Sequence, residues 1–446
     1  MNLSPEAILA EVKNSPNPKV KVAITDIDGV LRGKYLHKDK FTSAAKSGFG
    51  FCNVIFGWDI NDLALDGLDY TGWHTGYPDA EASIDLSTYR KVPWDNDVSF
   101  FLGNFELEIC PRNLLKKVKA DCEKSGFRPF FGQEFEWFNF KGTSEELNAQ
   151  EFHNLKHLSD GMFGYSVLRM ALNKDFFNDL YDLCDKFRVP IEGLHTETGP
   201  GVLEAAILYG DVLESADRAV LFKSAAKEIG RRHGIMPTFM AKITDKLPGC
   251  SGHIHQSLWD EKNNLFFDDK SQNKMSPLME SYIAGLLHCM PHVLPMYAPT
   301  INSYKRLVEG AWAPTTLTWG IDNRTTCIRP LPISSKAARI ELRVVGSDAN
   351  PYLAHAAALA SGLYGIKNKM KLSVPETKGN GYLNHKNGIL PRNLMEATLK
   401  MRESDLAKEL FGETFVKHFA RTREWEWQQY QKAVTDWEYK RYFEIV

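Results

Sequence analysis

The stretch Gly132-Gln133-Glu134-Phe135-Glu136-Trp137-Phe138 places two acidic residues inside a run of aromatic ones. Aromatic residues favour β-strands, and Gly126 and Gly142 punctuate the run on both sides, so the stretch predicts a strand. Side chains alternate across a strand, which places Glu134 and Glu136 on one face, about 6–7 Å apart. Two neighbouring carboxylates repel unless a positive group lies between them. Taken alone, the pattern fits the exposed face of an amphipathic strand better than a metal site.

The overall composition is typical of a globular protein. The chain has 446 residues, of which 43% are hydrophobic and 25% charged, enough for one large and one smaller domain. The net charge of −2 argues against a broad basic surface, so we expect no nucleic acid and no membrane as partner. Seven scattered cysteines without a C-x-x-C pair favour free thiols in a reducing compartment, and we expect a cytoplasmic protein without a signal peptide.

Strand and helix patterns alternate along the chain without the regular rhythm of a doubly wound fold, which indicates an α+β fold. Strands are predicted at 20–27, 30–36, 50–56 and 97–105, and the first helical spacing after them begins at Pro111. We therefore expect a small, sheet-rich domain over residues 1–107 and a larger one over 108–446. In the larger domain, the patterns predict strands at 130–138, 238–242, 252–259 and 340–345, and helices at 111–125, 175–187, 217–233, 275–290, 351–367 and, for the most part, from 394 to the end.

Three further stretches place charged residues inside strands that are otherwise apolar. They are His195-Thr-Glu197 with Glu204 seven residues later, His253-Ile-His255-Gln-Ser257, and Arg339-Ile-Glu341-Leu-Arg343. A single buried histidine or ion-paired glutamate is ordinary, but five glutamates and one histidine in such positions indicate a common site. Mostly oxygen ligands with one imidazole suit Mg²⁺ or Mn²⁺, whereas structural zinc prefers cysteine and histidine.

A second group of charged residues lies between residues 305 and 343. Its arginines and lysines are interleaved with Trp312, Trp319 and prolines, which is unusual for a solvated basic face. Arginine presents a planar fork that matches carboxylate and phosphate groups. The sequence contains neither a P-loop nor a G-x-G-x-x-G motif after a strand. Carboxylate-bound divalent ions with an arginine cluster therefore indicate phosphoryl transfer from a nucleotide that is bound without either of these motifs.

At these residues the sequence resembles the glutamine synthetase family over nearly its whole length. The markers, in chain order, are Asp26-Ile-Asp-Gly29 with Arg32-Gly-Lys34, Glu134-Phe-Glu136, His195-Thr-Glu197, His253-Ile-His255-Gln-Ser257, Asn302-Ser-Tyr-Lys-Arg-Leu307, Asp322-Asn-Arg324, Arg339-Ile-Glu341-Leu-Arg343 and Asn350-Pro-Tyr-Leu353. The resemblance implies a β-grasp-like N-terminal domain and an α+β catalytic domain. It also implies active sites shared between neighbouring subunits of a homo-oligomer, either a dodecamer of two hexameric rings or a decamer.

The resemblance further implies roles for individual residues. One metal would bind Glu136, Glu197 and Glu204 and another Glu134, His253 and Glu341, with two to three Mg²⁺ or Mn²⁺ ions in each active site. ATP, as co-substrate, would contact Glu192, His255, Ser257, Arg329, Lys336 and Arg339. Glutamate would be held by Arg306, Arg343 and Gly249, and Arg324 would stabilise the transferring phosphoryl group. In the family chemistry, ATP phosphorylates the side-chain carboxylate of glutamate, and an amine then displaces the phosphate.

Two positions depart from the family members that use ammonia. Their flap glutamate corresponds to Trp312, and the aspartate that a neighbouring subunit supplies corresponds to Cys52. Both carboxylates that would hold ammonium are therefore absent. An apolar slot with an indole wall would instead cover an alkyl or aryl group and offer a cation–π contact to an amine. The Trp312-Ala313-Pro314 flap is similar to that of the γ-glutamyl-amine ligases of the family.

The motifs leave three candidate functions. We favour an ATP-dependent ligase that joins L-glutamate to a small organic primary amine through a γ-glutamyl phosphate, with Arg324, Trp312 and Cys52 as catalytic residues. The second is a divergent glutamine synthetase that uses ammonia, against which Trp312 and Cys52 argue. The third is a non-catalytic structural protein similar to lengsin. Loss of metal ligands would mark such a protein, and all six ligands are present.

Overall fold

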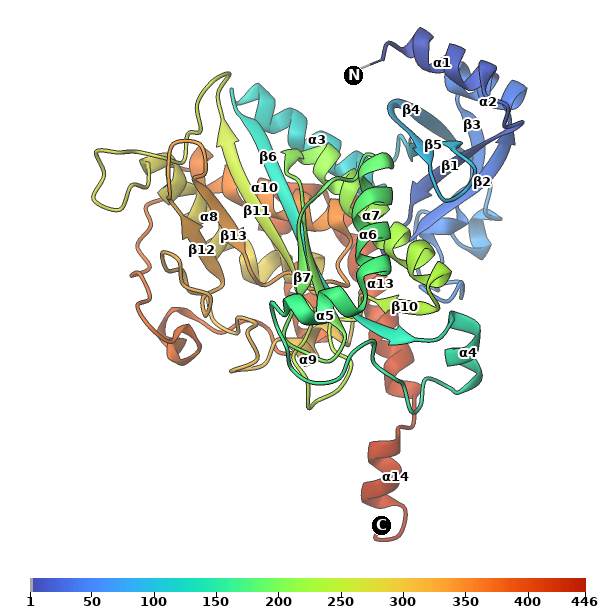
Figure 1. The fold of residues 1–446 in the computed structure, drawn as a ribbon. Helices are drawn as coiled ribbons and strands as arrows, with labels where there is room; N and C mark the ends of the chain where they lie inside the picture. The colour runs from blue at the N-terminus through green and yellow to red at the C-terminus, as the bar shows by residue number, and fades with distance from the viewer. Residues whose placement is uncertain (1–2) are drawn as a thin grey trace.

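The computed structural model describes residues 3–446, which form two β-sheets with helices packed around them (Figure 1). Residues 19–105 contribute a five-stranded sheet in the order β2-β1-β5-β4-β3. Residues 128–342 contribute an eight-stranded sheet, in which β12-β13-β11-β6-β8-β7 are successive neighbours and β9 and β10 also pair with β6. The predicted α+β class is confirmed.

The N-terminal sheet is covered on both faces. Its strands are β1 (Lys19–Thr25), β2 (Leu31–His37), β3 (Phe49–Cys52), β4 (Asp79–Val92) and β5 (Val98–Phe105). Helices α1 (Pro5–Asn14) and α2 (Lys38–Ser47) pack on one face, where the rings of Phe41 and Phe101 lie 4.7 Å apart. On the other face, Phe100 and Leu102 share a core with residues of α6 (Lys174–Lys186) and α7 (Val212–Arg232). Apolar burial therefore holds this sheet against the rest of the chain.

The predicted strands of the N-terminal region are confirmed in part. Strands β1, β2 and β5 form where they were predicted. The expected strand 50–56 is wrong beyond Cys52, because Asn53–Phe56 form the 3-10 helix η1 and bury Ile55 and Phe56 in the core. Strand β4 was not predicted, since its register shifts between Asp85 and Arg90 and breaks the regular alternation.

One face of the eight-stranded sheet packs in the main cores, and part of the other face carries polar groups. Its strands are β6 (Arg128–Lys141), β7 (Ile191–Thr196), β8 (Val202–Ile207), β9 (Gly210–Asp211), β10 (Ile235–Thr238), β11 (Gly252–Trp259), β12 (Ile328–Leu331) and β13 (Arg339–Leu342). On β6, Phe131, Phe135 and Trp137 are buried in the core. Because side chains alternate, Glu134 and Glu136 point to the opposite face, as the sequence predicts.

Helices cover the apolar face of this sheet. They are α3 (Pro111–Lys124), α7, α8 (Pro277–Val293) and α10 (Pro351–Lys367), and residues of all four join the apolar cores against the strands. Helices α8 and α10 approach closely, because a Cβ atom added to Gly285 would lie 2.3 Å from the carbonyl oxygen of Ser361. Glycine is therefore required where the two backbones meet.

The predicted elements of the larger region differ in accuracy. Strand β11 and helix α10 have the predicted bounds, and α6 agrees within one residue at each end. The strand expected at 238–242 is wrong, since β10 ends at Thr238 and the chain then continues as a loop to Ser251. The strand expected at 340–345 ends at Leu342, and α7 begins five residues before the predicted Asp217. Strand β12 was not predicted, whereas β7 and β8 form where the sequence predicts apolar strands, without definite bounds, around His195 and Glu204.

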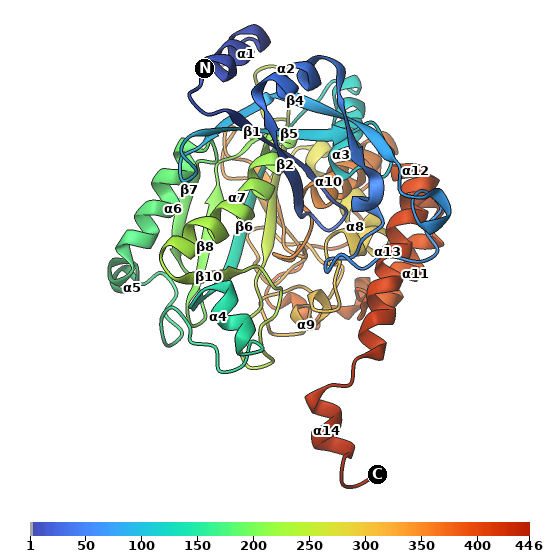
Figure 2. The same ribbon diagram turned by 90° about the vertical axis from the view of Figure 1, so that its right-hand side faces the viewer.

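The C-terminal region is mostly helical, as predicted. It contains α11 (Leu394–Arg402), α12 (Asp405–Phe411), α13 (Glu413–Lys432) and α14 (Asp436–Tyr442), and the shorter helices elsewhere are α4 (Ser144–Ala149), α5 (Val167–Leu172) and α9 (Ser303–Arg306). Helix α14 projects away from the body of the molecule (Figures 1 and 2). It carries exposed aromatic side chains, among them Trp437, Tyr439 and, just beyond its end, Phe443.

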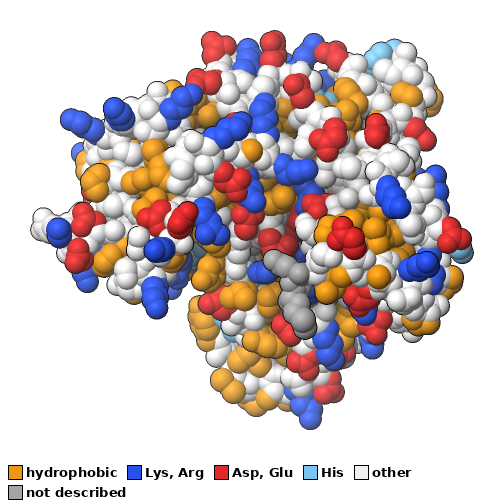
Figure 3. Space-filling model, turned by 90° about the horizontal axis from the view of Figure 1, so that it is seen from above, with side chains coloured by type: hydrophobic (Ala, Val, Ile, Leu, Met, Phe, Trp, Pro, Cys, Tyr) orange, Lys and Arg blue, Asp and Glu red, His pale blue; other side chains and the backbone are white. Residues whose placement is uncertain are grey.

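Two surface properties bear on partners. Within residues 3–446, every helix is too short or too polar to span a membrane. On the face that Figure 3 shows, acidic and basic side chains are interspersed, in keeping with the net charge of −2.

Candidate active site

Strand register brings the acidic residues of β6 next to charged residues of its neighbours. Glu134 lies opposite His253 of β11, and Glu136 lies opposite Glu204 of β8. The partners are about 70 to 120 residues away in the chain, so long-range strand pairing assembles this face. Glu134 and His253 belong to one cluster and Glu204 to a second, on opposite sides of β6.

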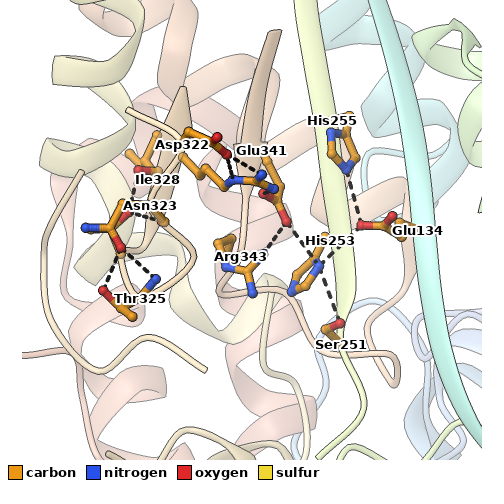
Figure 4. A network of polar contacts seen from close by, with 12 residues as sticks. Glu134, Ser251, His253, His255, Asp322, Asn323, Thr325, Ile328, Glu341 and Arg343 are labelled. Atoms are coloured by element: carbon orange, nitrogen blue, oxygen red, sulfur yellow. Dashed lines mark hydrogen bonds and ion pairs between the residues drawn. The ribbon is translucent and has the colours of Figure 1, made fainter. Parts of the chain in front are cut away.

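The first cluster joins Glu134, His253, His255 and Glu341 (Figure 4). His253 Nδ1 lies 3.4 Å from a carboxylate oxygen of Glu134 and 3.3 Å from one of Glu341. His255 Nε2 lies 3.3 Å from the same oxygen of Glu134. Ligand atoms of Glu134, His255 and Glu341 all fall within 4.8 Å of one another. The structure thus brings the three predicted ligands of one metal together and adds His255; their role as ligands stays a prediction.

The second cluster joins His195, Glu197 and Glu204, whose ligand atoms also fall within 4.8 Å of one another. His195 Nε2 lies 3.1 Å from Glu204 Oε1, and His195 Nδ1 lies 3.9 Å from Glu197 Oε2. Glu136, the third predicted ligand here, accepts a hydrogen bond of 2.6 Å from the amide of Ser251. His195 was not predicted as a ligand. Its position two residues before Glu197, in a stretch predicted to be an apolar strand, was the available signal.

The charges of the two clusters act on one another. Burial, together with the charges of Glu134 and Glu136, raises the pKa of Glu204 to about 8 despite a hydrogen bond from His195. Burial opposes protonation of His195, but the hydrogen bond and charge of Glu204 outweigh it and raise the pKa of His195 to about 9. Burial would raise the pKa of Glu134 as well, yet hydrogen bonds from His253 and His255 hold it well below its usual range. Neighbouring carboxylates thus oppose the ionisation of Glu204, and a bound cation would stabilise its ionised form.

This donor set fits the predicted Mg²⁺ or Mn²⁺. Carboxylate oxygens with a few imidazole nitrogens are ligands that such ions accept. In addition, the buried Nε2 atom of His253 has no hydrogen-bond partner within residues 3–446. A buried polar atom without a partner is costly, and a bound ion with its water would supply one.

Arginines surround Glu341. Arg329 Nη1 donates to one carboxylate oxygen of Glu341 at 2.8 Å, and Arg343 Nη1 donates to the other. Arg329 Nε also donates to Asp322 Oδ1 at 3.0 Å. Although burial opposes ionisation of Glu341, the charges of His253 and Arg343 outweigh it and lower the pKa of Glu341 to about 2. Two of the predicted phosphate- and carboxylate-binding arginines therefore lie beside the first cluster.

Two predicted glutamate-binding residues lie deeper. Arg306 is 2% exposed, and its guanidinium donates to the backbone carbonyls of Val344 and Arg343 at 3.0 Å each. In this structure Arg306 thus supports the backbone that carries Arg343. Gly249 packs against Arg306, since a Cβ atom added to Gly249 would lie 2.7 Å from Arg306 Cγ and 2.6 Å from the carbonyl oxygen of Ala241. A glycine is required there by close packing. Binding of glutamate by either residue stays a prediction.

A cavity of about 410 Å³ lies beside the first cluster. Its lining includes five of the six predicted nucleotide-binding residues, namely Glu192, His255, Ser257, Lys336 and Arg339. The aromatic side chains of Phe130, Tyr209 and Trp259 also line it. Cationic groups next to aromatic rings suit the phosphates and the base of a nucleotide. Arg329, the sixth residue, instead lies between Asp322 and Glu341.

The three predicted catalytic residues lie outside this cavity and both clusters. Arg324 is exposed on the turn that follows Asp322. Trp312 is 59% exposed and has a φ of 59°, a left-handed conformation that is unusual for a bulky residue. Cys52 lies in the N-terminal sheet, where its Sγ donates to the carbonyl of Tyr77 at 3.3 Å.

Tyr165 is a further residue of the site that the sequence did not reveal. Its ring stacks on that of His195 with centroids 4.4 Å apart, and its amide donates to the carbonyl of Thr196 at 2.6 Å. Its φ of 55° is again left-handed. Such strained conformations are common at functional sites. The sequence shows neither the φ of Tyr165 nor the residue on which its ring stacks.

Comparisons with known proteins agree with this geometry. Residues 108–442 match the family described as glutamine synthetase, catalytic domain. The chain is 52% identical to type-1 glutamine synthetase 2 of Dictyostelium discoideum, over 99% of this chain and 86% of that protein. It is 36% identical to glutamate–isopropylamine ligase of a Pseudomonas species, over 96% of this chain and 95% of that protein.

A solved structure described as a GmaS/ADP complex has the same overall fold. It superposes with a TM-score of 0.85 at 26% identity, covering 99% of this chain and 100% of that one. Together with the clustered carboxylates, histidines and arginines, these matches show that the chain belongs to the glutamine synthetase family and is an ATP-dependent ligase.

Proposed function

We propose that the enzyme forms a γ-glutamyl amide from L-glutamate and a small organic primary amine, with ATP as phosphoryl donor. The observation that carries this proposal is the exposed indole of Trp312 at the flap position where ammonia-using members have a glutamate. The nearest acidic residue before it in the chain, Glu309, is exposed and three residues away. An uncharged, largely apolar wall favours an amine with an apolar body over ammonium.

The relatives support this proposal and its alternative to different degrees. One relative, 36% identical, is named for isopropylamine as its acceptor. Another, 52% identical, is named a glutamine synthetase, so a divergent enzyme that uses ammonia remains the competing function. A non-catalytic role similar to that of lengsin has no comparable support, because all six predicted metal ligands are present and five of them, all but Glu136, lie in the two clusters.

In the proposed mechanism, the chain's own residues bind and orient the two substrates. ATP would occupy the cavity of about 410 Å³, with its phosphates toward Lys336 and Arg339. The two clusters would hold Mg²⁺ or Mn²⁺, which would spread the negative charge of the transferring phosphoryl group. Arg324, which is exposed, would add a guanidinium to that charge. Arg343, supported by Arg306, would hold a carboxylate of glutamate.

The acceptor would enter beside Trp312. Its amino group attacks the carbonyl carbon of the γ-glutamyl phosphate, the carbon–oxygen bond to phosphate breaks, and the amide forms with release of inorganic phosphate and a proton. Exclusion of water by the amine's apolar body and the indole would favour aminolysis over hydrolysis of the acyl phosphate.

The same proposal includes a division into two domains and an oligomer. The parallel pairing of β1 with β5 at the centre of a mixed sheet, with α2 on one face, supports a β-grasp-like domain over residues 1–107 and a catalytic domain over 108–446. Cys52 lies outside both clusters, which supports a site completed by the N-terminal domain of a neighbouring subunit. The projecting helix α14, with its exposed aromatic residues, supports a homo-oligomer, a dodecamer or a decamer.

Phosphate release with ATP and L-glutamate, measured over a panel of primary amines and ammonium, tests the proposal. We expect an alkyl or aryl amine to give a higher kcat/KM than ammonium, and mass spectrometry to identify the γ-glutamyl amide. Ammonium as the best acceptor, with glutamine as product, would instead establish a divergent glutamine synthetase.

A further inference from the structure

The loops that carry Arg324 and Trp312 are both hydrogen-bonded to one segment, residues 377–390, which we call the bridging segment. It follows α10 in the chain and contains only the short 3-10 helices Gly381–Leu383 and His385–Asn387. Its Thr377 amide donates to the carbonyl of Trp319 at 2.9 Å, which ties its beginning to the chain between the two loops. A single segment can therefore set the positions of both loops together.

On the side of Arg324, the contacts with the bridging segment are made by Asn323, which Figure 4 shows beside Thr325. Its Nδ2 donates to the carbonyls of Thr377 at 3.0 Å and Gly379 at 2.8 Å. Its Oδ1 accepts from the amide and the hydroxyl of Thr325 at 3.0 and 2.7 Å. Two donors and two acceptor lone pairs are thus all used, which is the full capacity of an asparagine side chain.

Thr325 strengthens the same connection, since its Oγ1 accepts from the amide of Gly381 at 2.8 Å. A Cβ atom added to Gly381 would lie 2.6 Å from the carbonyl oxygen of Thr325, so the two backbones are in close contact. The turn that carries Arg324 is therefore held directly against the bridging segment.

On the side of Trp312, the contacts are made by the chain just after the flap. Thr316 Oγ1 donates to the carbonyl of Gly381 at 3.0 Å, and the amide of Leu317 donates to the carbonyl of Gly388 at 3.0 Å. In return, the amide of Leu390 donates to the carbonyl of Thr315 at 2.9 Å. Gly381 thus contacts both loops, one through its amide and the other through its carbonyl.

Arg324 depends on this arrangement for its own position. Within residues 3–446, its guanidinium makes no hydrogen bond or ion pair, and its neighbour Asp322 is tied to Arg329 instead. The position of a side chain without such contacts is set mainly by the backbone that carries it. Here the backbone of the turn is fixed on one side by Arg329 and on the other by Asn323.

We propose that Asn323 is a positioning residue that, through the bridging segment, fixes the Arg324 guanidinium relative to the acceptor slot at Trp312. This inference rests on the proposed roles of Arg324 and Trp312. A displacement of about 1 Å at such a group is enough to cost on the order of 10²-fold in rate. Because ATP binds elsewhere, loss of Asn323 should lower kcat with little change in the KM for ATP.

The test is a double-mutant cycle of Asn323→Asp and Arg324→Ala, followed by phosphate release. Aspartate keeps the shape of asparagine but replaces the donor group that faces the carbonyls of Thr377 and Gly379. We expect Asn323→Asp to lower kcat about 10- to 100-fold while the KM for ATP changes less than about twofold. In the Arg324→Ala background the same change should cost less than about twofold, since the group that it positions is gone.

Two further variants separate positioning from folding. Thr325→Val removes the acceptor of the Gly381 amide and should give the same kcat loss and the same non-additivity with Arg324→Ala. Asn384→Ala is the matched control, because within residues 3–446 the side chain of Asn384 donates to Thr377 Oγ1 alone, at 3.1 Å, and makes no hydrogen bond to the turn. It should keep kcat within about twofold of wild type.

The acceptor in all these assays is the one that wild type uses fastest, ammonium included, so the cycle can be measured even if the proposed amine preference fails. An undiminished kcat in both Asn323→Asp and Thr325→Val would overturn the proposal. So would an equal cost of Asn323→Asp with and without Arg324, since that pattern belongs to a structural residue.

Discussion

The exposed indole of Trp312 leads to the most discriminating prediction, a reversal of acceptor preference by Trp312→Glu. The substitution places a carboxylate on the flap where ammonia-using family members have one. It removes the apolar wall and adds a charge that attracts ammonium. We expect the ratio of kcat/KM for propylamine to that for ammonium to fall sharply.

The size of the effect follows from the surface available at this residue. A tryptophan offers up to about 250 Å², and Trp312 is 59% exposed, so on the order of 150 Å² of it can be covered. A three-carbon chain that is buried against it gains about 0.8 kcal/mol for each methylene, or about 2.4 kcal/mol in all. This energy corresponds to roughly 60-fold in kcat/KM. The preference of wild type for propylamine over ammonium should therefore be of that order.

The assay is phosphate release at fixed ATP and L-glutamate, with methylamine, ethylamine, propylamine and ammonium in parallel. In wild type, each added methylene should raise kcat/KM about threefold to fourfold until the indole is covered. Trp312→Ala separates the two effects of Trp312→Glu, because it removes the wall without adding a charge. It should flatten the dependence on chain length without improving the use of ammonium.

Two controls complete the design. Tyr181→Glu adds a carboxylate at another exposed aromatic residue, on α6, and should leave the acceptor preference unchanged. Cys52→Asp combined with Trp312→Glu should shift the preference further toward ammonium than Trp312→Glu alone. A wild-type enzyme whose kcat/KM is independent of chain length, or a Trp312→Ala variant that keeps the dependence, would refute the role given to the indole.

Three further properties can be measured directly. Saturating Mg²⁺ or Mn²⁺ with nucleotide should raise the Tm, because a ligand at a hundredfold excess over its Kd stabilises the folded state by about 2.7 kcal/mol. An unchanged Tm in wild type would count against the metal clusters. Glu136→Ala should abolish phosphate release. Analytical ultracentrifugation should find an active decamer or dodecamer, and full activity in a monomer would refute the shared site and the role of Cys52. Burial lowers the pKa of His418 to about 4, so stability from its neutral form is complete above about pH 6.5 and is lost as the pH falls toward 4, by about 3 kcal/mol. Urea unfolding of His418→Gln should therefore show a smaller loss of stability between pH 7 and pH 4.5 than wild type, and an equal loss would show that His418 does not carry this pH dependence.

Local chemistry along the sequence determined several elements closely. Helix α10 begins with Pro351 at its first position and Asn350 as its cap, whose side chain accepts from the amide of Tyr352 at 3.0 Å. Such start signals are local, so they are visible without the fold. The alternation of aromatic and acidic residues in β6 likewise identified the face that carries Glu134 and Glu136.

Other elements depended on partners that are distant in the chain. Strands β7 and β8 are short and carry His195 and Glu204, so they lack the clean alternation of a half-buried strand. They form because β8 pairs with β6 and β7 pairs with β8. Strand β4 was missed for a related reason, since the shift of its register follows from its pairing with β5.

The sequence by itself determined which side chains could bind a metal and, for β6 and β11, which of them share one face of the strand. Only the tertiary structure decided which of them meet, because the meeting depends on register between strands that are remote in sequence. A slip of one residue between β6 and β11 would turn His253 away from Glu134 and place an apolar neighbour there. The stacking of Tyr165 on His195 and the burial of Arg306 beneath Arg343 are likewise properties of packing, and no local pattern encodes them.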